Sequence, residues 1–240
     1  MKTKPKLAVF CDFDGTITEK DIGDELFKEL GVFEPYHTQL IEGELDISEY
    51  WKILCKSLGK TAEYDYIYHF VDKYNVDSNF RMFAEFLREE EIPIKVVSDG
   101  FDVYIDSVLN RLELDWIPVH SNKMVFIAGK EPVPYFPLAS ESCDCKVASC
   151  KRNAVLNSCD HETIIIYIGD GISDFCAAEH SDIIFAKKKL AAHCNKHRIP
   201  HYPFANFFDV YRIMKDIILQ GKAKQRNQAL MLRNKAFETE

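Results

Sequence analysis

The sequence has no hydrophobic run that approaches the roughly 20 consecutive apolar residues needed to cross a membrane. It has no internal repeat and no low-complexity segment. The first apolar run ends at Cys11 and Asp12, too early for the apolar core of a secretory signal peptide, so we interpret it as a buried strand. We therefore expect a cytoplasmic protein whose eight cysteines stay reduced.

An excess of positive charge is also absent. The 30 Lys and Arg residues are outnumbered by 38 Asp and Glu residues, which gives a formal net charge of −8. A chain of this sign binds nucleic acids and anionic membranes poorly, so we expect neither as a partner. An anionic substrate would need local positive groups or a metal ion to hold it.

The composition is that of a folded protein. Of the 240 residues, 47% are hydrophobic and 12% are aromatic, which is enough for a sizeable core. The length predicts one large domain, or one domain with an insert. Short apolar runs typical of central strands lie at residues 7–11, 93–98, 116–120, 163–168 and 182–186. Helical patterns separate most of these runs, and this alternation predicts an α/β fold with a doubly wound parallel sheet.

The connection between Asp12 and Ser98 is far longer than the dozen or so residues that a crossover needs. Amphipathic helical patterns fill it, and they start near Ile22, Ile47 and Tyr64. We expect one or two of the aromatic residues in these patterns, Tyr50 and Trp51 among them, to line a cavity.

These patterns predict a domain division. We expect a small helical cap over residues 18–77 and a catalytic core formed by residues 1–17 and 78–240. Residues 122–137 are interpreted as a β-hairpin excursion from that core. The polar, basic tail over residues 221–240 predicts a frayed helix or a disordered segment, and we assign it no function.

Two carboxylates follow the first strand, which ends in CDFDGTIT. Side chains alternate along a strand, so Asp12 and Asp14 can project on one side where the strand becomes a loop. Ligands of open α/β sheets bind beyond the carboxyl ends of the strands. Gly15 lets the backbone turn, and Thr16 adds a hydroxyl group and an amide. An acidic turn would have the same residues, but its place directly after a buried strand favours a functional site.

Two later segments supply groups suited to phosphate. The run PIKVVS ends at Ser98 and is followed by Asp99 and Gly100. The Ser98 hydroxyl group and the backbone amides of this turn suit a phosphate oxygen. A helix cap would use the same residues. Lys151 opens the helical segment KRNAVL. It matters for function only if it points at the same strand ends; otherwise it is a solvated surface lysine.

Further carboxylates follow the strand TIIIYI, which ends in GDGISD. Asp170 and Asp174 could simply favour the start of the next helix. Carboxylates gathered together repel one another, however, and their joint ionisation requires a cation. Oxygen ligands of this kind favour Mg²⁺.

Taken together, DxDGT, a Ser, a Lys and GDGxSD resemble the four motifs of the haloacid dehalogenase superfamily of phosphatases. The helical insert is similar to the C1 cap of phosphoserine phosphatase. The resemblance implies that Asp12 is the nucleophile that becomes an aspartyl phosphate. It implies that Asp14 is the general acid that protonates the leaving oxygen and then the base that activates water.

The same resemblance implies the ligand sets. Ser98 and Lys151 would hold the phosphoryl oxygens, and the expected phosphate site also includes Thr16, Asp99 and Gly100. The expected Mg²⁺ ligands are Asp12, the backbone carbonyl of Asp14 and Asp170, with Asp174 in support.

Other segments narrow the resemblance. VVSDGFDVYID, the cysteines ahead of Lys151 and IPHYPFANFFDV resemble the branch that holds the methionine-salvage phosphatase of 2-hydroxy-3-keto-5-methylthiopentenyl-1-phosphate. Phosphoethanolamine/phosphocholine phosphatases and phosphoserine phosphatase are nearby relatives. We therefore expect a small phosphorylated metabolite as substrate, and a homodimer is compatible with the sequence. Asp21 either contacts the substrate head group or caps the first helix of the insert.

A different class of protein has similar residues. A phospho-accepting receiver-like signalling domain also gathers aspartates, a hydroxyl group and a lysine around Mg²⁺. The insert and Asp14 favour an enzyme, because a substrate enclosure and a general acid serve turnover.

Three cysteines form a C-x-C-x4-C pattern at Cys143, Cys145 and Cys150. A zinc site would need a fourth ligand. The candidates for it are His120, His161 and another cysteine. A reduced, partly buried cluster and a disulfide formed on oxidation are the alternatives. We interpret Cys11 and Cys176 as small core residues.

Overall fold

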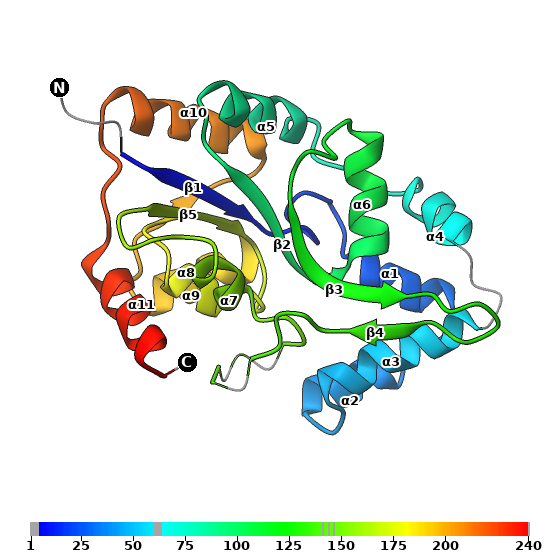
Figure 1. Cartoon of the computed structure of the whole chain (residues 1–240). Helices are drawn as coiled ribbons and strands as arrows, with labels where there is room; N and C mark the ends of the chain where they lie inside the picture. The colour runs from blue at the N-terminus through cyan, green and yellow to red at the C-terminus, as the bar shows by residue number, and fades with distance from the viewer. Residues whose placement is uncertain (1–4, 60–63, 141, 144, 146, 240) are drawn as a thin grey trace.

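The computed structural model describes residues 5–59, 64–140, 142–143, 145 and 147–239. Its centre is a seven-stranded sheet in the order β4-β3-β2-β1-β5-β6-β7 (Figure 1). Neighbouring strands run parallel, except that β3 and β4 are antiparallel. The strands are β1 Leu7–Cys11, β2 Ile94–Phe101, β3 Val119–Val125, β4 Val133–Tyr135, β5 Ile164–Gly169, β6 Ile183–Ala186 and β7 Tyr202–Pro203. The predicted doubly wound α/β fold is confirmed.

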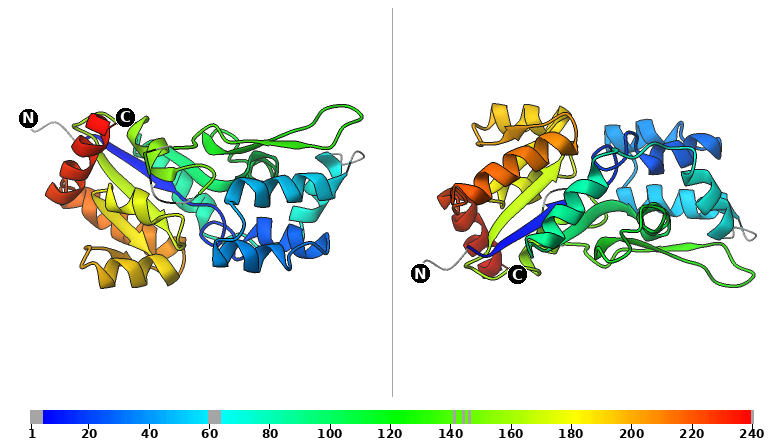
Figure 2. Two further views of the ribbon diagram at one scale, coloured as in Figure 1. Left: turned by 90° about the horizontal axis from the view of Figure 1, so that it is seen from below. Right: turned by 90° about the horizontal axis from the view of Figure 1, so that it is seen from above.

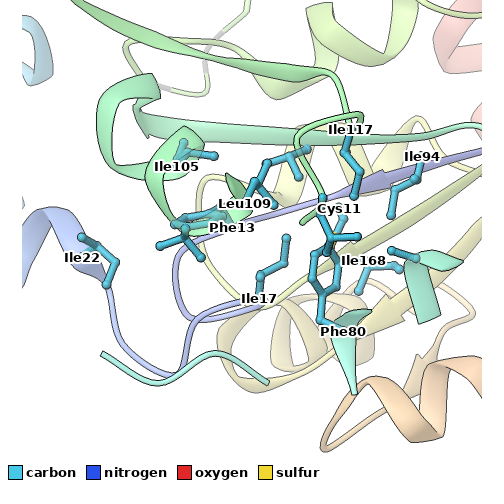
Figure 3. Close-up of a cluster of buried hydrophobic side chains, with 14 of the residues drawn as sticks. Cys11, Phe13, Ile17, Ile22, Phe80, Ile94, Ile105, Leu109, Ile117 and Ile168 are labelled. Atoms are coloured by element: carbon cyan, nitrogen blue, oxygen red, sulfur yellow. The ribbon is translucent and has the colours of Figure 1, made fainter. Parts of the chain in front are cut away.

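Strand β1 lies in the middle of the sheet, between β2 and β5. Its alternate side chains enter different cores: Val9 and Cys11 pack in one hydrophobic cluster and Phe10 in another. Both faces are therefore covered, which explains why this strand is a continuous apolar run. Figure 3 shows Cys11 within the first of these clusters.

Helices cover both faces of the sheet (Figure 2). On one face, Phe80 of α5 packs against Phe207 of α10, with ring centroids 4.8 Å apart. On the other face, α7, α8 and α9 contribute Ala154, Ala177 and Leu190 to the second cluster. The bounds are α5 Phe80–Glu89, α6 Asp102–Arg111, α7 Lys151–Leu156, α8 Phe175–Glu179, α9 Lys188–Lys196, α10 Phe207–Leu219 and α11 Asn227–Thr239.

The insert after β1 is helical, as the amphipathic patterns predict. It contains α1 Ile22–Glu29, α2 Tyr36–Glu42, α3 Ile47–Leu58 and α4 Tyr64–Val71. Trp51 of α3 packs edge-on against Phe101 at the end of β2, with ring centroids 4.9 Å apart, so this helix lies beside the carboxyl ends of the strands. The division into a cap over 18–77 and a core over the rest of the chain stays a prediction.

Helix α2 and strand β3 differ from the sequence-based expectation. Helix α2 has no fully buried residue, and its apolar stripe is short, with Tyr36 and Leu40 packing against the core, so the pattern does not stand out in the sequence. Strand β3 begins later than residues 116–120 because Pro118 precedes it, and buried polar residues, Ser121 and Asn122, interrupt its apolar pattern. The predicted hairpin over residues 122–137 is present: β3 and β4 pair antiparallel, and β3 also pairs with β2, so the hairpin extends from the core sheet.

The tail forms the packed helix α11 over most of its length, rather than a frayed or disordered segment. Arg233 is buried and donates hydrogen bonds to the His180 carbonyl at 2.7 Å and to Asp182 at 3.2 Å. The composition of the tail alone does not predict that Arg233 is buried in an ion pair with Asp182. Within the described part of the chain, no helix is both long and apolar enough to span a membrane.

Candidate functional site

The carboxyl ends of β1, β2 and β5 meet at a cavity of about 440 Å³. Helices of the insert close its other side. The cavity brings together most of the predicted site residues from four separate stretches of sequence: Asp12, Asp14, Asp21, Ser98, Asp99, Gly100, Lys151 and Asp170. Thr16 and Asp174 are buried next to it and contact Asp170.

Lys151 is the central cation of the site. It is the first residue of α7, and its Nζ lies 2.5 Å from Asp12 Oδ1 and 2.7 Å from Asp174 Oδ1. The side chains of these three residues are 3%, 4% and 0% exposed. Burial opposes the charge of Lys151, but the two carboxylates outweigh it and raise its pKa above the ordinary value. Lys151 is therefore a buried cation rather than a solvated surface lysine.

Three carboxylates cluster here, two of which contact this lysine. Oxygen atoms of Asp12, Asp170 and Asp174 lie within 4.8 Å of one another. Burial raises the pKa of Asp12, and the neighbouring charges of Asp174 and Asp170 add to the increase despite Lys151. Lys151 pairs with Asp12 and Asp174, and Lys188 pairs with Asp170. Two lysines do not fully offset three carboxylates, so the oxygen-rich cluster fits a divalent cation such as Mg²⁺.

The two aspartates of the GDGISD segment differ in how their oxygens are used. Asp174 is saturated: Oδ2 accepts the amide hydrogens of Asp170 and Gly171 at 2.9 and 2.8 Å, and Oδ1 accepts from Tyr167 and Lys151 at 2.7 Å each. Asp170 faces the cavity more openly. This difference agrees with a supporting position for Asp174 in a metal site.

Asp14 lies at the cavity edge in a different environment. Its Oδ1 accepts the Ile22 amide hydrogen at 2.8 Å, and its Oδ2 is 3.2 Å from the Tyr104 hydroxyl and 3.4 Å from Ser98 Oγ. Burial and then the charge of Asp21 raise the pKa of Asp14. The protonated form of Asp14 is thus favoured, which a general acid requires.

Two glycines allow these close approaches. Gly15 has φ +73°, and a Cβ there would lie 2.6 Å from Asp170 Oδ2. A Cβ on Gly100 would lie 1.8 Å from the Tyr104 hydroxyl and 2.8 Å from Asp14 Oδ2. Any larger residue at either position would displace a carboxylate of the site.

The predicted phosphate-binding residues fall into two groups. Ser98 is buried, and its Oγ accepts the Gly100 amide hydrogen at 2.9 Å beside the cavity. The side chains of Thr16 and Asp99 are turned to other partners. The Thr16 hydroxyl donates to Asp170 Oδ1 at 3.3 Å, and its backbone amide donates to the Phe13 carbonyl at 3.2 Å, so both of its donors already have partners.

The Asp99 carboxylate holds the loop that precedes α7. It accepts the Ser149 amide hydrogen at 2.7 Å and lies 3.3 Å from Asn122 Nδ2. Burial raises the pKa of Asp99 to about 7, although the Ser149 amide, Lys151 and Asn122 oppose the increase. Any phosphate contact of Asp99 is therefore confined to its backbone.

The position of Asp21 is compatible with both of the roles foreseen for it. It is the N-cap of α1, where its Oδ1 accepts the Asp24 amide hydrogen at 2.9 Å, and it also lines the cavity. Asp24 lies beside it on the same cavity wall.

The cavity wall facing the strand ends is aromatic. Tyr50, Trp51 and His37 line it, as do Leu40 and Ile47. The Tyr50 hydroxyl, Trp51 Nε1 and His37 Nδ1 are buried without a hydrogen-bond partner among the described residues. Buried polar atoms are normally satisfied, so these three groups are available to a ligand.

Sequence reasoning missed several residues of the site. Tyr104 and Tyr167 are fully buried and reach Asp14 and Asp174 through their hydroxyl groups. Lys188 lies 2.9 Å from Asp170 Oδ2. The tyrosines sit within apolar patterns that predict core positions, and the lysine belongs to a run of three, so only the folded geometry distinguishes them.

Comparisons with known proteins relate the chain to phosphatases. The family described as Putative Phosphatase matches residues 7–202. The chain is 28% identical to the 2-hydroxy-3-keto-5-methylthiopentenyl-1-phosphate phosphatase of Brevibacillus brevis, over 88% of this chain and 96% of the relative. It is 28% identical to the polyol phosphate phosphatase PYP1 of Saccharomyces cerevisiae, over 90% and 96%. A substrate-bound phosphoserine phosphatase shares the fold, with a TM-score of 0.63 at 18% identity over 88% of this chain and 99% of that one.

Proposed function

Because the chain belongs to the Putative Phosphatase family, we propose that it is a Mg²⁺-dependent phosphomonoesterase of the haloacid dehalogenase type that acts through an aspartyl phosphate. The observation that carries this proposal is the buried Lys151 between Asp12 and Asp174, beside Asp14 at the cavity. Phosphoryl transfer needs positioning and charge stabilisation, and this arrangement offers both.

The residues that would hold Mg²⁺ are Asp12, Asp170 and the backbone carbonyl of Asp14, with Asp174 behind them. When bound, the ion would offset the negative charge that a carboxylate nucleophile and a phosphate bring together.

In the first step, a carboxylate oxygen of Asp12 attacks phosphorus, and the bond from phosphorus to the leaving oxygen breaks. Asp14 gives its proton to that oxygen, and the alcohol leaves. In the second step, Asp14 takes a proton from water, and the water oxygen displaces Asp12 from phosphorus. Inorganic phosphate leaves with Asp12 restored and Asp14 protonated again.

Lys151 and Ser98 would hold the phosphoryl oxygens during both steps. Lys151 is already ion-paired with Asp12, so it supplies positive charge where the phosphate arrives without a change of position. Preorganised charge of this kind costs no rearrangement during the reaction.

The substrate that we propose is 2-hydroxy-3-keto-5-methylthiopentenyl-1-phosphate. The Brevibacillus brevis relative bears the name of this activity. The aromatic and aliphatic wall of Trp51, Leu40 and Ile47 suits an apolar methylthio chain, and the unpartnered Tyr50 hydroxyl and Trp51 Nε1 suit hydroxyl and carbonyl oxygens.

Phosphoserine and phosphoethanolamine or phosphocholine are the second candidates. Asp21 and Asp24 line the same cavity, and their carboxylates would favour a substrate with an ammonium head group. A receiver-like signalling domain would hold its phosphoryl group rather than release it repeatedly.

The test is phosphate release from a panel: the salvage intermediate, phosphoserine, phosphoethanolamine, phosphocholine and a polyol phosphate. We expect repeated turnover, with the highest kcat/KM for the salvage intermediate. Asp12→Asn should remove turnover with every substrate, whereas Asp115→Asn, the same change at an exposed position, should not. A higher kcat/KM for an ammonium substrate would transfer the assignment to the second candidates. A single phosphorylation event without release would refute the enzyme.

A further inference from the structure

Four cysteine sulfurs gather at the start of the helix that Lys151 opens. Cys143, Cys145 and Cys150 lie just before α7, and Cys176 is the second residue of α8. All four sulfur atoms lie within 4.8 Å of one another. The interpretation of Cys176 as a small core residue is therefore wrong, because its neighbours are the other three thiols.

The two histidines considered as fourth ligands lie elsewhere. His120 is part of β3, and His161 packs edge-on against Phe237 of α11. Neither belongs to the group of sulfur atoms. The fourth member of the group is Cys176, which lies too far along the chain to belong to the C-x-C-x4-C pattern.

The distances between the sulfurs fit a metal better than a disulfide. The Cys145 and Cys150 sulfurs are 3.6 Å apart, and those of Cys150 and Cys176 are 4.0 Å apart. A Zn–S bond of about 2.3 Å gives tetrahedral S···S edges of about 3.8 Å, between these two values. A disulfide would need about 2.05 Å.

We propose that Cys143, Cys145, Cys150 and Cys176 bind one structural Zn²⁺. Four thiolates close the tetrahedron and leave no open position for a water or a substrate, so the ion would be structural rather than catalytic. Thiolate ligands favour zinc, and the carboxylates of Asp12 and Asp170 favour magnesium, so the two neighbouring sites sort the two metals by ligand chemistry.

The position of the cluster indicates what the ion would stabilise, namely the first turns of α7 and α8. Cys150 is the N-cap of α7, directly before Lys151, and Cys176 follows Asp174, the N-cap of α8, by two residues. Helices α7 and α8 span six and five residues, which is too short to be stable alone. The zinc would hold their first turns together, where Lys151 and Asp174 form their ion pair.

The first experiment measures zinc in the protein purified under reducing conditions without chelator, by elemental analysis. We expect about one zinc ion per chain. Replacement by Co²⁺ should give thiolate-to-cobalt charge-transfer absorption and the visible bands of a tetrahedral site. Protein that contains no zinc and gives no such bands when loaded with Zn²⁺ or Co²⁺ would overturn the proposal, as would a Cys145–Cys150 disulfide in the freshly purified protein.

Two variants test the ligand set, and one serves as control. Cys176→Ser and Cys143→Ser should each lose most of the bound zinc, while Cys159→Ser, a half-buried cysteine outside the cluster, should keep it. Cys143 lies in a half-buried loop, so its variant remains informative if Cys176→Ser does not fold. Full zinc content in either ligand variant would overturn the ligand set. Removal of zinc should lower the melting temperature of the wild-type protein by at least roughly 5 °C.

Discussion

Asp14 offers the sharpest test of the mechanism, because its replacement by asparagine preserves the local contacts. The amide oxygen of the new side chain could still accept the Ile22 amide hydrogen, and its NH₂ group would face two hydroxyl oxygens, those of Tyr104 and Ser98. The Asp14→Asn protein should therefore fold normally. What it loses is the transferable proton. General acid–base catalysis contributes about 10²- to 10⁴-fold, so kcat for an alkyl phosphate should fall by that factor, or about 3–5 kcal/mol of barrier.

The leaving group separates the two roles of Asp14. p-Nitrophenolate leaves without a proton, so the variant should still form the aspartyl phosphate from p-nitrophenyl phosphate. The second step lacks its base, and the enzyme should stall there. Rapid mixing should show a burst of about one p-nitrophenol per chain, followed by slow turnover. With an alkyl phosphate, the first step itself is slow and no burst should occur.

Two controls accompany this measurement. Asp12→Asn should show no burst with either substrate, because the nucleophile is gone. Asp24→Asn changes a carboxylate on the cavity wall outside the reacting group and should turn over p-nitrophenyl phosphate steadily. If Asp14→Asn keeps kcat within about threefold of the wild type on an alkyl phosphate, the acid/base role is refuted.

Three further predictions concern the metal, the cavity and the loop before α7. Chelation of Mg²⁺ should stop phosphate release, and added Mg²⁺ should restore it; activity that persists in chelator would refute the metal assignment. Trp51→Ala should raise KM for the salvage intermediate roughly 10- to 100-fold with a smaller effect on kcat, whereas Trp116→Ala, outside the cavity, should leave KM unchanged. The pKa of Asp99 rises to about 7 on folding, so its contribution to stability is present at low pH and is lost as pH rises from about 4 through 7. The melting temperature of Asp99→Asn should consequently fall less between pH 4 and pH 7 than that of the wild type. Equal slopes of melting temperature against pH for the two proteins would contradict a buried, protonated Asp99 carboxyl.

The sequence predicts the strand ends of the site well, because chemistry and pattern coincide there. The runs before Asp12, Ser98 and Asp170 are short, apolar and central in the sheet, so their loops had to meet at one edge. The local sequence around Lys151 does not predict its position in the site, since a lysine that opens a short helix is usually solvated. Its burial depends on Asp12 and Asp174, which are distant in sequence.

The parts that sequence reasoning missed depend on contacts rather than on pattern. Tyr104 lies in a helix with a buried face, where any apolar residue would fit the periodicity, and only the missing side chain of Gly100 lets its hydroxyl reach Asp14. Cys176 follows the GDGISD segment and joins the other cysteines through the packing of α7 against α8. Helix α2 has no fully buried residue and only Tyr36 and Leu40 pack against the core, so its hydrophobic pattern is weak.

The core and the site impose opposite demands on the same residues. Burial of Asp12 and Asp14 raises the pKa of both carboxyls, which means that their ionised forms are destabilised by the fold. Lys151 offsets part of this cost at Asp12, and the Ile22 amide does so at Asp14. A cation at Asp12 and Asp170 would remove much of the remaining repulsion. The proposed Mg²⁺ would therefore stabilise the folded protein as well as the reaction, since both depend on the same uncompensated negative charge.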